Sequence, residues 1–208
     1  MPWLGFWNKI LSSDVFILST GIQFVRRSYG NRAVMKDNNS WATIPVFFNF
    51  ENYNKILISD MGAVKQIGRR VLHWSQQKQY KYSNRLDEII DRLINNDENN
   101  LCQLNIDLIF LILKAINHKS TKLVIEDYSW GNEDKTKIIT SMVMKYGNVY
   151  LSGSSGIKYM SRDDIKEVDK AYIQRVLPDI GGETILHSIA YEEKPIDYIN
   201  KNATWEIW

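Results

Sequence analysis

Hydrophobic positions along the chain switch between helical and strand-like spacing, and this pattern predicts a mixed α/β protein. Apolar residues recur every three or four positions over residues 3–12, directly after Pro2, which is typical of a short helix that begins at a proline. The run Val15–Leu18 is apolar throughout, as expected of a strand that is buried on both faces in a mainly parallel sheet. A helix followed by a buried strand is therefore expected at the start.

The central part of the chain predicts a small β element and then helices. Residues 41–48 have strand composition but contain Pro45, which favours an edge or interrupted strand, and residues 55–59 form a second short candidate. Residues 64–96 have helical spacing. Apolar residues occupy nearly every side of the segment 101–116, which indicates a buried helix.

The second half follows a strand–helix–strand order. Strands are expected at 122–125 and 149–151 with a helix at 135–145 between them, and such an order favours a right-handed crossover. Further helices are expected at 162–176 and 184–191. The predicted fold is one α/β domain over residues 1–208, with a mainly parallel sheet flanked by helices and an additional small β element near residues 41–59.

Composition narrows the classes of function. With 26 Lys and Arg against 24 Asp and Glu, the net charge of +2 is too small for a protein that binds nucleic acid chiefly by neutralising phosphates, so a basic patch would have to be local. The single Cys102 excludes an internal disulfide, and the three histidines lack ligand spacing, so we expect no metal site. No cofactor is indicated. Neither a membrane-spanning run nor a secretory leader is recognisable, which favours a cytoplasmic location.

The first candidate for ligand binding is the arginine segment, residues 23–32. It combines two amides with three guanidinium groups, and guanidinium groups bind carboxylates and phosphates through two parallel hydrogen bonds. Aromatic residues interleave with it, so a base or sugar ring would stack there. The competing interpretation is an exposed basic loop with salt bridges to Asp14 or Asp37. The polar members are Gln23, Arg26, Arg27, Asn31 and Arg32, and the aromatic ones Phe24, Tyr29 and Trp41.

The second candidate is the glycine-serine loop, residues 152–156, which leaves the carboxyl end of a predicted strand. Ligands of open α/β sheets bind at this edge, and glycines let a ligand approach the backbone closely. A plain turn is the competing interpretation, because the ending of a Walker loop is absent. The candidate ligand-binding residues are Ser152, Gly153, Ser154, Ser155, Gly156 and Lys158.

Two residues are candidates for catalysis. His73 stands beside arginines on a predicted helix and would act as a general base, since imidazole titrates near neutral pH. Gln23 would orient the substrate through hydrogen bonds. An ordinary surface histidine is the competing interpretation for His73.

Taken in order, these residues resemble the WbqC-like protein family, whose members occur in bacterial gene clusters for surface polysaccharide assembly. Two positions depart from the family pattern: Thr20 and Gly21 stand where the family usually carries acids, and the chain begins at the second proline of the family's opening motif. The matching residues are Pro2, Trp3, Gly5, Phe6, Asp14, Gln23, Phe24, Arg26, Arg27, Asn31, Arg32, Tyr150, Leu151, Ser152, Gly153, Gly156 and Tyr159.

The resemblance implies a transferase that moves a small acyl or aminoacyl group onto an anionic, nucleotide- or sugar-linked acceptor. Two alternatives stay open: a phage-type transferase that modifies a nucleobase in DNA, and a non-catalytic ligand-binding module. The expected partner is a small-molecule or nucleotide-linked substrate, with DNA as the further possibility. Donor, acceptor and oligomeric state are left open by the sequence.

Overall fold

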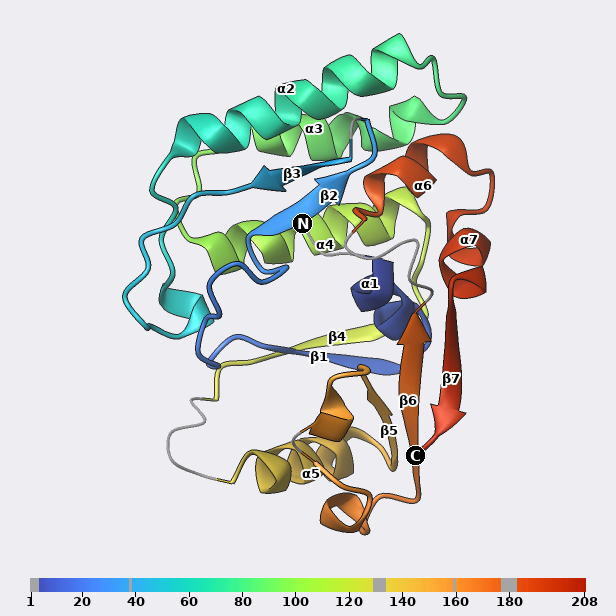
Figure 1. The fold of residues 1–208 in the computed structure, drawn as a ribbon. Helices are drawn as coiled ribbons and strands as arrows, with labels where there is room; N and C mark the ends of the chain where they lie inside the picture. The colour runs from blue at the N-terminus through green and yellow to red at the C-terminus, as the bar shows by residue number, and fades with distance from the viewer. Residues whose placement is uncertain (1–3, 38, 129–133, 159, 177–182) are drawn as a thin grey trace.

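The structure is a computed structural model that describes residues 4–37, 39–128, 134–158, 160–176 and 183–208. Figure 1 shows the helices and strands along the chain. In order they are α1 (Leu4–Leu11), β1 (Val15–Ser19), β2 (Arg32–Met35), β3 (Ser40–Thr43), η1 (Tyr53–Lys55), α2 (Met61–Gln77), η2 (Ser83–Leu86), α3 (Asp87–Ile94), α4 (Leu101–Ala115), β4 (Lys122–Glu126), α5 (Lys135–Tyr146), β5 (Val149–Ser152), η3 (Gly156–Lys158), η4 (Asp163–Ile165), β6 (Lys170–Val176), α6 (Leu186–Tyr191), α7 (Pro195–Lys201) and β7 (Ala203–Ile207).

Short polar side chains begin the three longest helices. The side chain of Asp60 accepts a hydrogen bond from the Ala63 backbone N–H at the start of α2, and Asn100 does the same for Gln103 at the start of α4. Asp134 caps α5 in the same manner. Each cap satisfies a backbone donor that the helix leaves free, which stabilises the helix by about 1 kcal/mol.

The described strands form three small sheets. β1 pairs with β4 in parallel, β2 and β3 form an antiparallel hairpin, and β6 lies between β5, which is parallel to it, and β7, which is antiparallel. The mixed α/β composition and the parallel pairing are confirmed. The parallel pairs do not join into one mainly parallel sheet, because α5 leads from β4 in one sheet to β5 in another.

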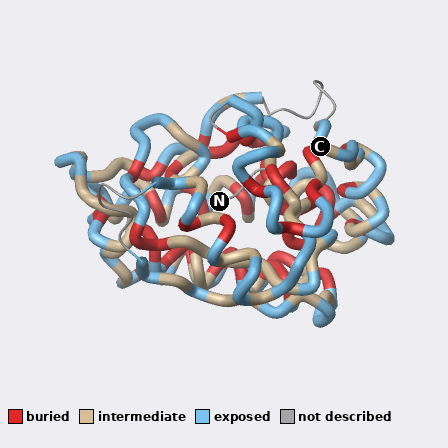
Figure 2. The backbone as a smooth tube through the Cα atoms, turned by 90° about the horizontal axis from the view of Figure 1, so that it is seen from below, coloured by how far each residue is buried: buried red, intermediate tan, exposed pale blue. Residues whose placement is uncertain are grey.

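The main hydrophobic core lies among the helices. In Figure 1 the β2–β3 hairpin runs between α2 and α4, and Figure 2 shows the buried stretches surrounded by exposed turns. Large side chains with less than 2% of their surface exposed include Trp7, Leu86 and Leu108, from α1, η2 and α4. Burial of each such side chain contributes about 2 kcal/mol before the loss of conformational entropy.

A second, smaller core packs α5 against β5 and β6. Met160, Ile165, Val168 and Ala171 are its buried members, with Trp208 packed against them. Two separate hydrophobic clusters leave room for a cleft where they adjoin.

A set of hydrogen bonds joins α1 to β6 and α7. The Gln174 side chain, 1% exposed in β6, donates to the Gly5 carbonyl at 2.8 Å and to the Asn8 side chain at 2.7 Å. Asn8 donates in turn to Asn200 in α7 at 3.1 Å. Because buried amides are costly to leave unpaired, these bonds hold α1 in one orientation.

The predicted helices at 101–116 and 135–145 and the strands at 15–18, 122–125 and 149–151 are confirmed. The predicted helix over 64–96 is interrupted after α2, where Gln79 adopts a left-handed backbone with φ of 47°. The predicted helix over 162–176 is wrong, since these residues form η4 and the strand β6. Aromatic and β-branched residues in 171–176 favour a strand.

Candidate functional site

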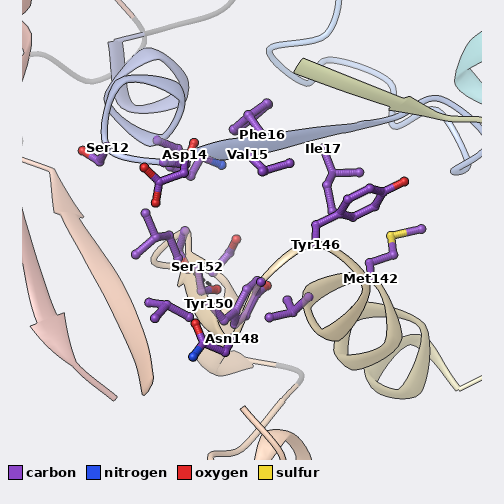
Figure 3. Close-up of a pocket in the computed structure, with 18 residues that line it drawn as sticks. Ser12, Asp14, Val15, Phe16, Ile17, Met142, Tyr146, Asn148, Tyr150 and Ser152 are labelled. Atoms are coloured by element: carbon purple, nitrogen blue, oxygen red, sulfur yellow. Dashed lines mark hydrogen bonds between the residues drawn. The ribbon is translucent and has the colours of Figure 1, made fainter. Parts of the chain in front are cut away.

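A cleft of about 500 Å³ lies between β1 and β5, where the two hydrophobic clusters adjoin (Figure 3). One wall consists of Lys9, residues 12–14 and the first half of β1. The opposite wall consists of the end of α5, residues 147–148, β5 and the beginning of the glycine-serine loop. The volume is typical of a site for a small molecule.

The glycine-serine loop is a tight turn at the end of β5. The Gly156 N–H donates to the Gly153 carbonyl at 2.9 Å, and the hydroxyl of the buried Ser152 donates to the same carbonyl at 3.1 Å. A Cβ at position 156 would lie 2.1 Å from Ser152 Oγ, so only glycine fits there unless the serine moves. Ser152, Gly153 and Ser155 line the cleft, whereas the exposed Ser154 and Lys158 do not. Gly156 is the last residue of the loop and does not line the cleft.

Lys9 contributes the only Lys or Arg side chain among the described residues that line this cleft. Its Nζ lies 3.6 Å from the position that a Cβ on Gly153 would take, so the amine faces the glycine-serine loop. Within the described ranges the amine forms no ion pair and no hydrogen bond, and the ring of Phe6 lies 6.0 Å away. Burial lowers the pKa of Lys9, because the charged form loses solvation.

The sequence prediction did not include Lys9. Its only sequence feature is that it is the single charged residue in the α1 segment Leu4–Leu11, five residues of which are buried. A cation on a short, largely buried helix is unusual, and this feature would have identified it as a candidate.

Tyr146, which lines the cleft, takes part in a polar contact between α5 and β4. The Tyr146 hydroxyl and Lys145 Nζ both donate to Glu126 Oε1, the latter at 2.8 Å. These hydrogen bonds, that of Lys145 first, lower the pKa of Glu126. Glu126 and Lys145 line a neighbouring hollow of about 410 Å³, and Met142 lines both spaces.

The arginine segment lies at the opposite end of β1 from the part that lines the cleft (Figure 1). Gln23, Arg26 and Arg27 are exposed, and Arg27 has a left-handed backbone with φ of 61°. None of them lines the cleft. Asp37, an alternative salt-bridge partner of this segment, pairs with Arg70 of α2.

Two further members of this segment have local contacts. Asn31 is buried and donates to the Ile44 carbonyl at 2.9 Å, a bond that ties the start of β2 to the residue after β3. Arg32 stacks on the exposed Trp41 ring, with 4.2 Å from its Cζ to the ring centroid, and Tyr29 lies 6.0 Å from the same ring. Asn31 therefore contributes to the structure of the β2–β3 hairpin, and Arg32 and Trp41 form a partly exposed aromatic and cationic surface.

Thr20 and Gly21, which depart from the family pattern, pack against the end of β4. The backbone N–H and the hydroxyl of Thr20 donate to the Glu126 carbonyl at 2.9 and 3.3 Å. A Cβ on Gly21 would lie 2.3 Å from the Tyr128 carbonyl oxygen. No acidic side chain fits at position 21 in this arrangement.

His73 is exposed on α2, which lies on the opposite side of the molecule from β5 (Figure 1). The structure does not bring it near the cleft or near Gln23. Arg70, one turn before His73, pairs with Asp37 and so contributes to joining α2 to the β2–β3 hairpin.

In the part of the chain that the structure describes, no three His, Cys, Asp or Glu side chains gather as metal ligands would. Cys102 is buried in α4, and burial raises the pKa of its thiol to about 11. Over the same residues, no helix is both long and apolar enough to cross a membrane.

Comparison with models of protein families gives one match. The model described as the WbqC-like protein family matches residues 1–174. The chain belongs to this family. Comparison with curated proteins and with solved structures gave no match. The part shared with the WbqC-like family includes every residue that lines the β1–β5 cleft, and three residues of the family pattern, Pro2, Trp3 and Tyr159, lie outside the described residues.

Proposed function

We propose that this WbqC-like protein is a transferase that moves a small acyl or aminoacyl group onto an anionic, nucleotide- or sugar-linked acceptor bound in the β1–β5 cleft. One observation carries the proposal: Lys9, an amine without an ionic partner among the described residues, faces the glycine-serine loop across the cleft. A phosphate or carboxylate of the acceptor would supply the missing partner.

The remaining lining suits an acceptor with a polar group and a less polar body. The lining includes the hydroxyl-bearing residues Ser12, Ser152 and Ser155 and the apolar β1 residues Val15–Ile17. Sugar and nucleotide ligands combine these two kinds of surface, and pockets that bind them place a few polar groups within an apolar lining.

A thermal-shift experiment tests the proposal. The protein is heated with nucleotide sugars, nucleoside diphosphates, acyl thioesters and amino acids, and a bound ligand raises the melting temperature in proportion to its occupancy. We expect a rise with an anionic ligand, its loss in Lys9→Met, and its retention in the matched control Lys158→Met, which changes an exposed lysine outside the cleft. An equal rise in melting temperature in both variants would mean that the ligand does not bind in the cleft. Binding without turnover would favour the non-catalytic module.

The exposed surface around Trp41 favours a second candidate, modification of a nucleobase in DNA. Arg32 and Tyr29 flank a Trp41 ring that is 45% exposed, and single-stranded nucleic acid binds to such combinations of stacking rings and cations. Two results would support this candidate. The affinity for a short single strand of DNA should fall steeply as the salt concentration rises, and it should be lower in Trp41→Ala than in the wild type.

A further inference from the structure

Two loops run side by side beyond the carboxyl end of β1 and form one surface, which we call the apolar tip. The tip comprises residues 22–27 and 47–50. Backbone hydrogen bonds join the two loops, and the Tyr53 N–H donates to the carbonyl of Ile22 at 2.8 Å. The Phe24 N–H donates to the carbonyl of Glu51 at 3.1 Å, so the residue after Phe24 lies next to the residue before Glu51.

The side chains of the apolar tip extend into solvent. Phe50 is 73% exposed, Val25 66% and Phe47 62%. Phe50 has a left-handed backbone with φ of 60°, which an aromatic residue adopts rarely, and its ring lies 4.8 Å from that of Phe48, which packs on the main core. Apolar side chains gathered in solvent gain free energy when another surface covers them, and such patches occur where a partner binds.

The charges of the apolar tip are positive. Arg26 and Arg27 are both exposed, and neither forms an ion pair with another residue that the structure describes. Glu51, which follows the second loop, pairs with Lys55 at 3.9 Å. Because guanidinium groups bind phosphates through two parallel hydrogen bonds, a surface of anionic phosphates complements the tip.

We propose that the apolar tip docks on an anionic lipid surface, with Phe50 and Val25 inserted below the headgroups and the guanidinium groups of Arg26 and Arg27 on the lipid phosphates. Peripheral proteins bind membranes by this combination of apolar insertion and basic side chains. A nucleic acid fits less well, because Val25 has no flat face on which a base can stack. The proposal goes beyond the proposed function and is independent of it, since no residue of the tip lines the β1–β5 cleft.

Co-sedimentation of the whole protein with phospholipid vesicles tests the proposal. One set of vesicles contains phosphatidylcholine alone, and the other contains equal parts of phosphatidylcholine and phosphatidylglycerol. We expect binding to the mixed vesicles and an affinity about tenfold lower for phosphatidylcholine alone, because each arginine near an anionic surface strengthens binding. The double variant Arg26→Gln/Arg27→Gln should lose this preference for the anionic lipid.

A pair of phenylalanine variants separates the tip from general adsorption. Phe50→Asn removes the ring and keeps a residue that tolerates the left-handed backbone, and it should lower the affinity for mixed vesicles about tenfold. Phe110→Gln is the matched control, since Phe110 is 51% exposed on α4 outside the tip, and it should bind as the wild type does. Melting temperatures of both variants confirm that they are folded.

Three results would overturn the proposal. The first is that the wild type binds neither kind of vesicle. The second is an equal loss of affinity in Phe50→Asn and Phe110→Gln, which would mean adsorption without a defined site. The third is binding to a short single strand of DNA that Phe50→Asn abolishes, with no binding to vesicles, which would assign the tip to nucleic acid.

Discussion

The β1–β5 cleft and the arginine segment differ in the number of charges they hold and in how far solvent reaches them. The arginine segment places three guanidinium groups within seven residues, and two of them are exposed. The described lining of the cleft includes one lysine, Lys9, which is partly buried and faces a loop that lies more than 140 positions later in the chain. Two of the clustered arginines therefore lie at the surface, whereas the lysine of the cleft lies where burial lowers its pKa.

The largest expected effect is that of Lys9→Met. Ligand-induced stabilisation should disappear, while the ligand-free variant should melt at a higher temperature, because an unpaired amine is replaced by a side chain that suits burial. A gain of about 1 kcal/mol is expected. Denaturation of wild type and variant, with and without the best ligand of the thermal-shift panel, measures both changes. A variant that is less stable and still binds would show that Lys9 only supports packing.

The same pair of proteins gives a pH-dependent prediction. In the folded state the pKa of Lys9 is below its ordinary 10.5, so the unfolded chain binds more protons between the two values. Stability of the wild type then rises with pH across that interval relative to Lys9→Met, which has no group to titrate. The stability difference between the two proteins should shrink as the pH approaches 10.5. A difference that does not vary with pH would contradict the burial of this amine.

The next effect concerns the glycine-serine loop. Gly156→Ala places a methyl group 2.1 Å from Ser152 Oγ. The variant should lower the free energy of unfolding by about 1–2 kcal/mol and should also lose ligand binding. Gly147→Ala is the matched control for stability alone, because a Cβ there meets nothing within 4 Å although Gly147 lines the cleft. The double variant Ser152→Ala/Gly156→Ala should recover part of the stability. Urea denaturation measures the stability of all three variants. If the double variant loses as much stability as Gly156→Ala, the Ser152 hydroxyl is not what the added methyl group clashes with.

A smaller effect is expected from Trp41→Ala in the exposed surface. The variant loses the contact between Trp41 and Arg32, worth about 0.5–1 kcal/mol, and should bind the cleft ligand as the wild type does. Isothermal titration with that ligand checks the prediction. A large loss of affinity would mean that the arginine segment and the cleft bind one extended substrate.

The smallest effect is expected from His73→Ala. The side chain is exposed on α2 and lies far from β5, so stability should change by no more than about 0.5 kcal/mol and ligand affinity should not change. A specific loss of turnover in this variant, at unchanged affinity, would restore the histidine as a catalytic candidate.

Local patterns predicted the parts of the fold that depend on neighbouring residues. The apolar run of β1, the buried helix α4 and the turn after β5 could all be predicted from the sequence. The pairing of β4 with β1 and of β5 with β6 could not, because α5 has the same pattern whichever sheet it leads to. The antiparallel strand β7 was missed for a similar reason: its partner β6 had been interpreted as helix.

Only one wall of the candidate site was predicted from the sequence. Ser152, Gly153 and Ser155 were identified because a glycine-serine loop after a strand is a local feature. Lys9 was missed because its surroundings come from distant parts of the sequence. Gln174 fixes the helix that carries it, and β5 lines the opposite wall of the cleft. Arg26 and Arg27 lie in solvent and outside the cleft, a placement that the sequence does not show.

Hydrogen–deuterium exchange, measured with and without the ligand that raises the melting temperature most, tests most directly whether the β1–β5 cleft is the substrate site. Binding in the cleft should slow exchange in residues 9–17 and 149–156 and leave residues 23–41 unchanged. Protection confined to residues 23–41 would contradict this assignment and place the substrate on the arginine segment.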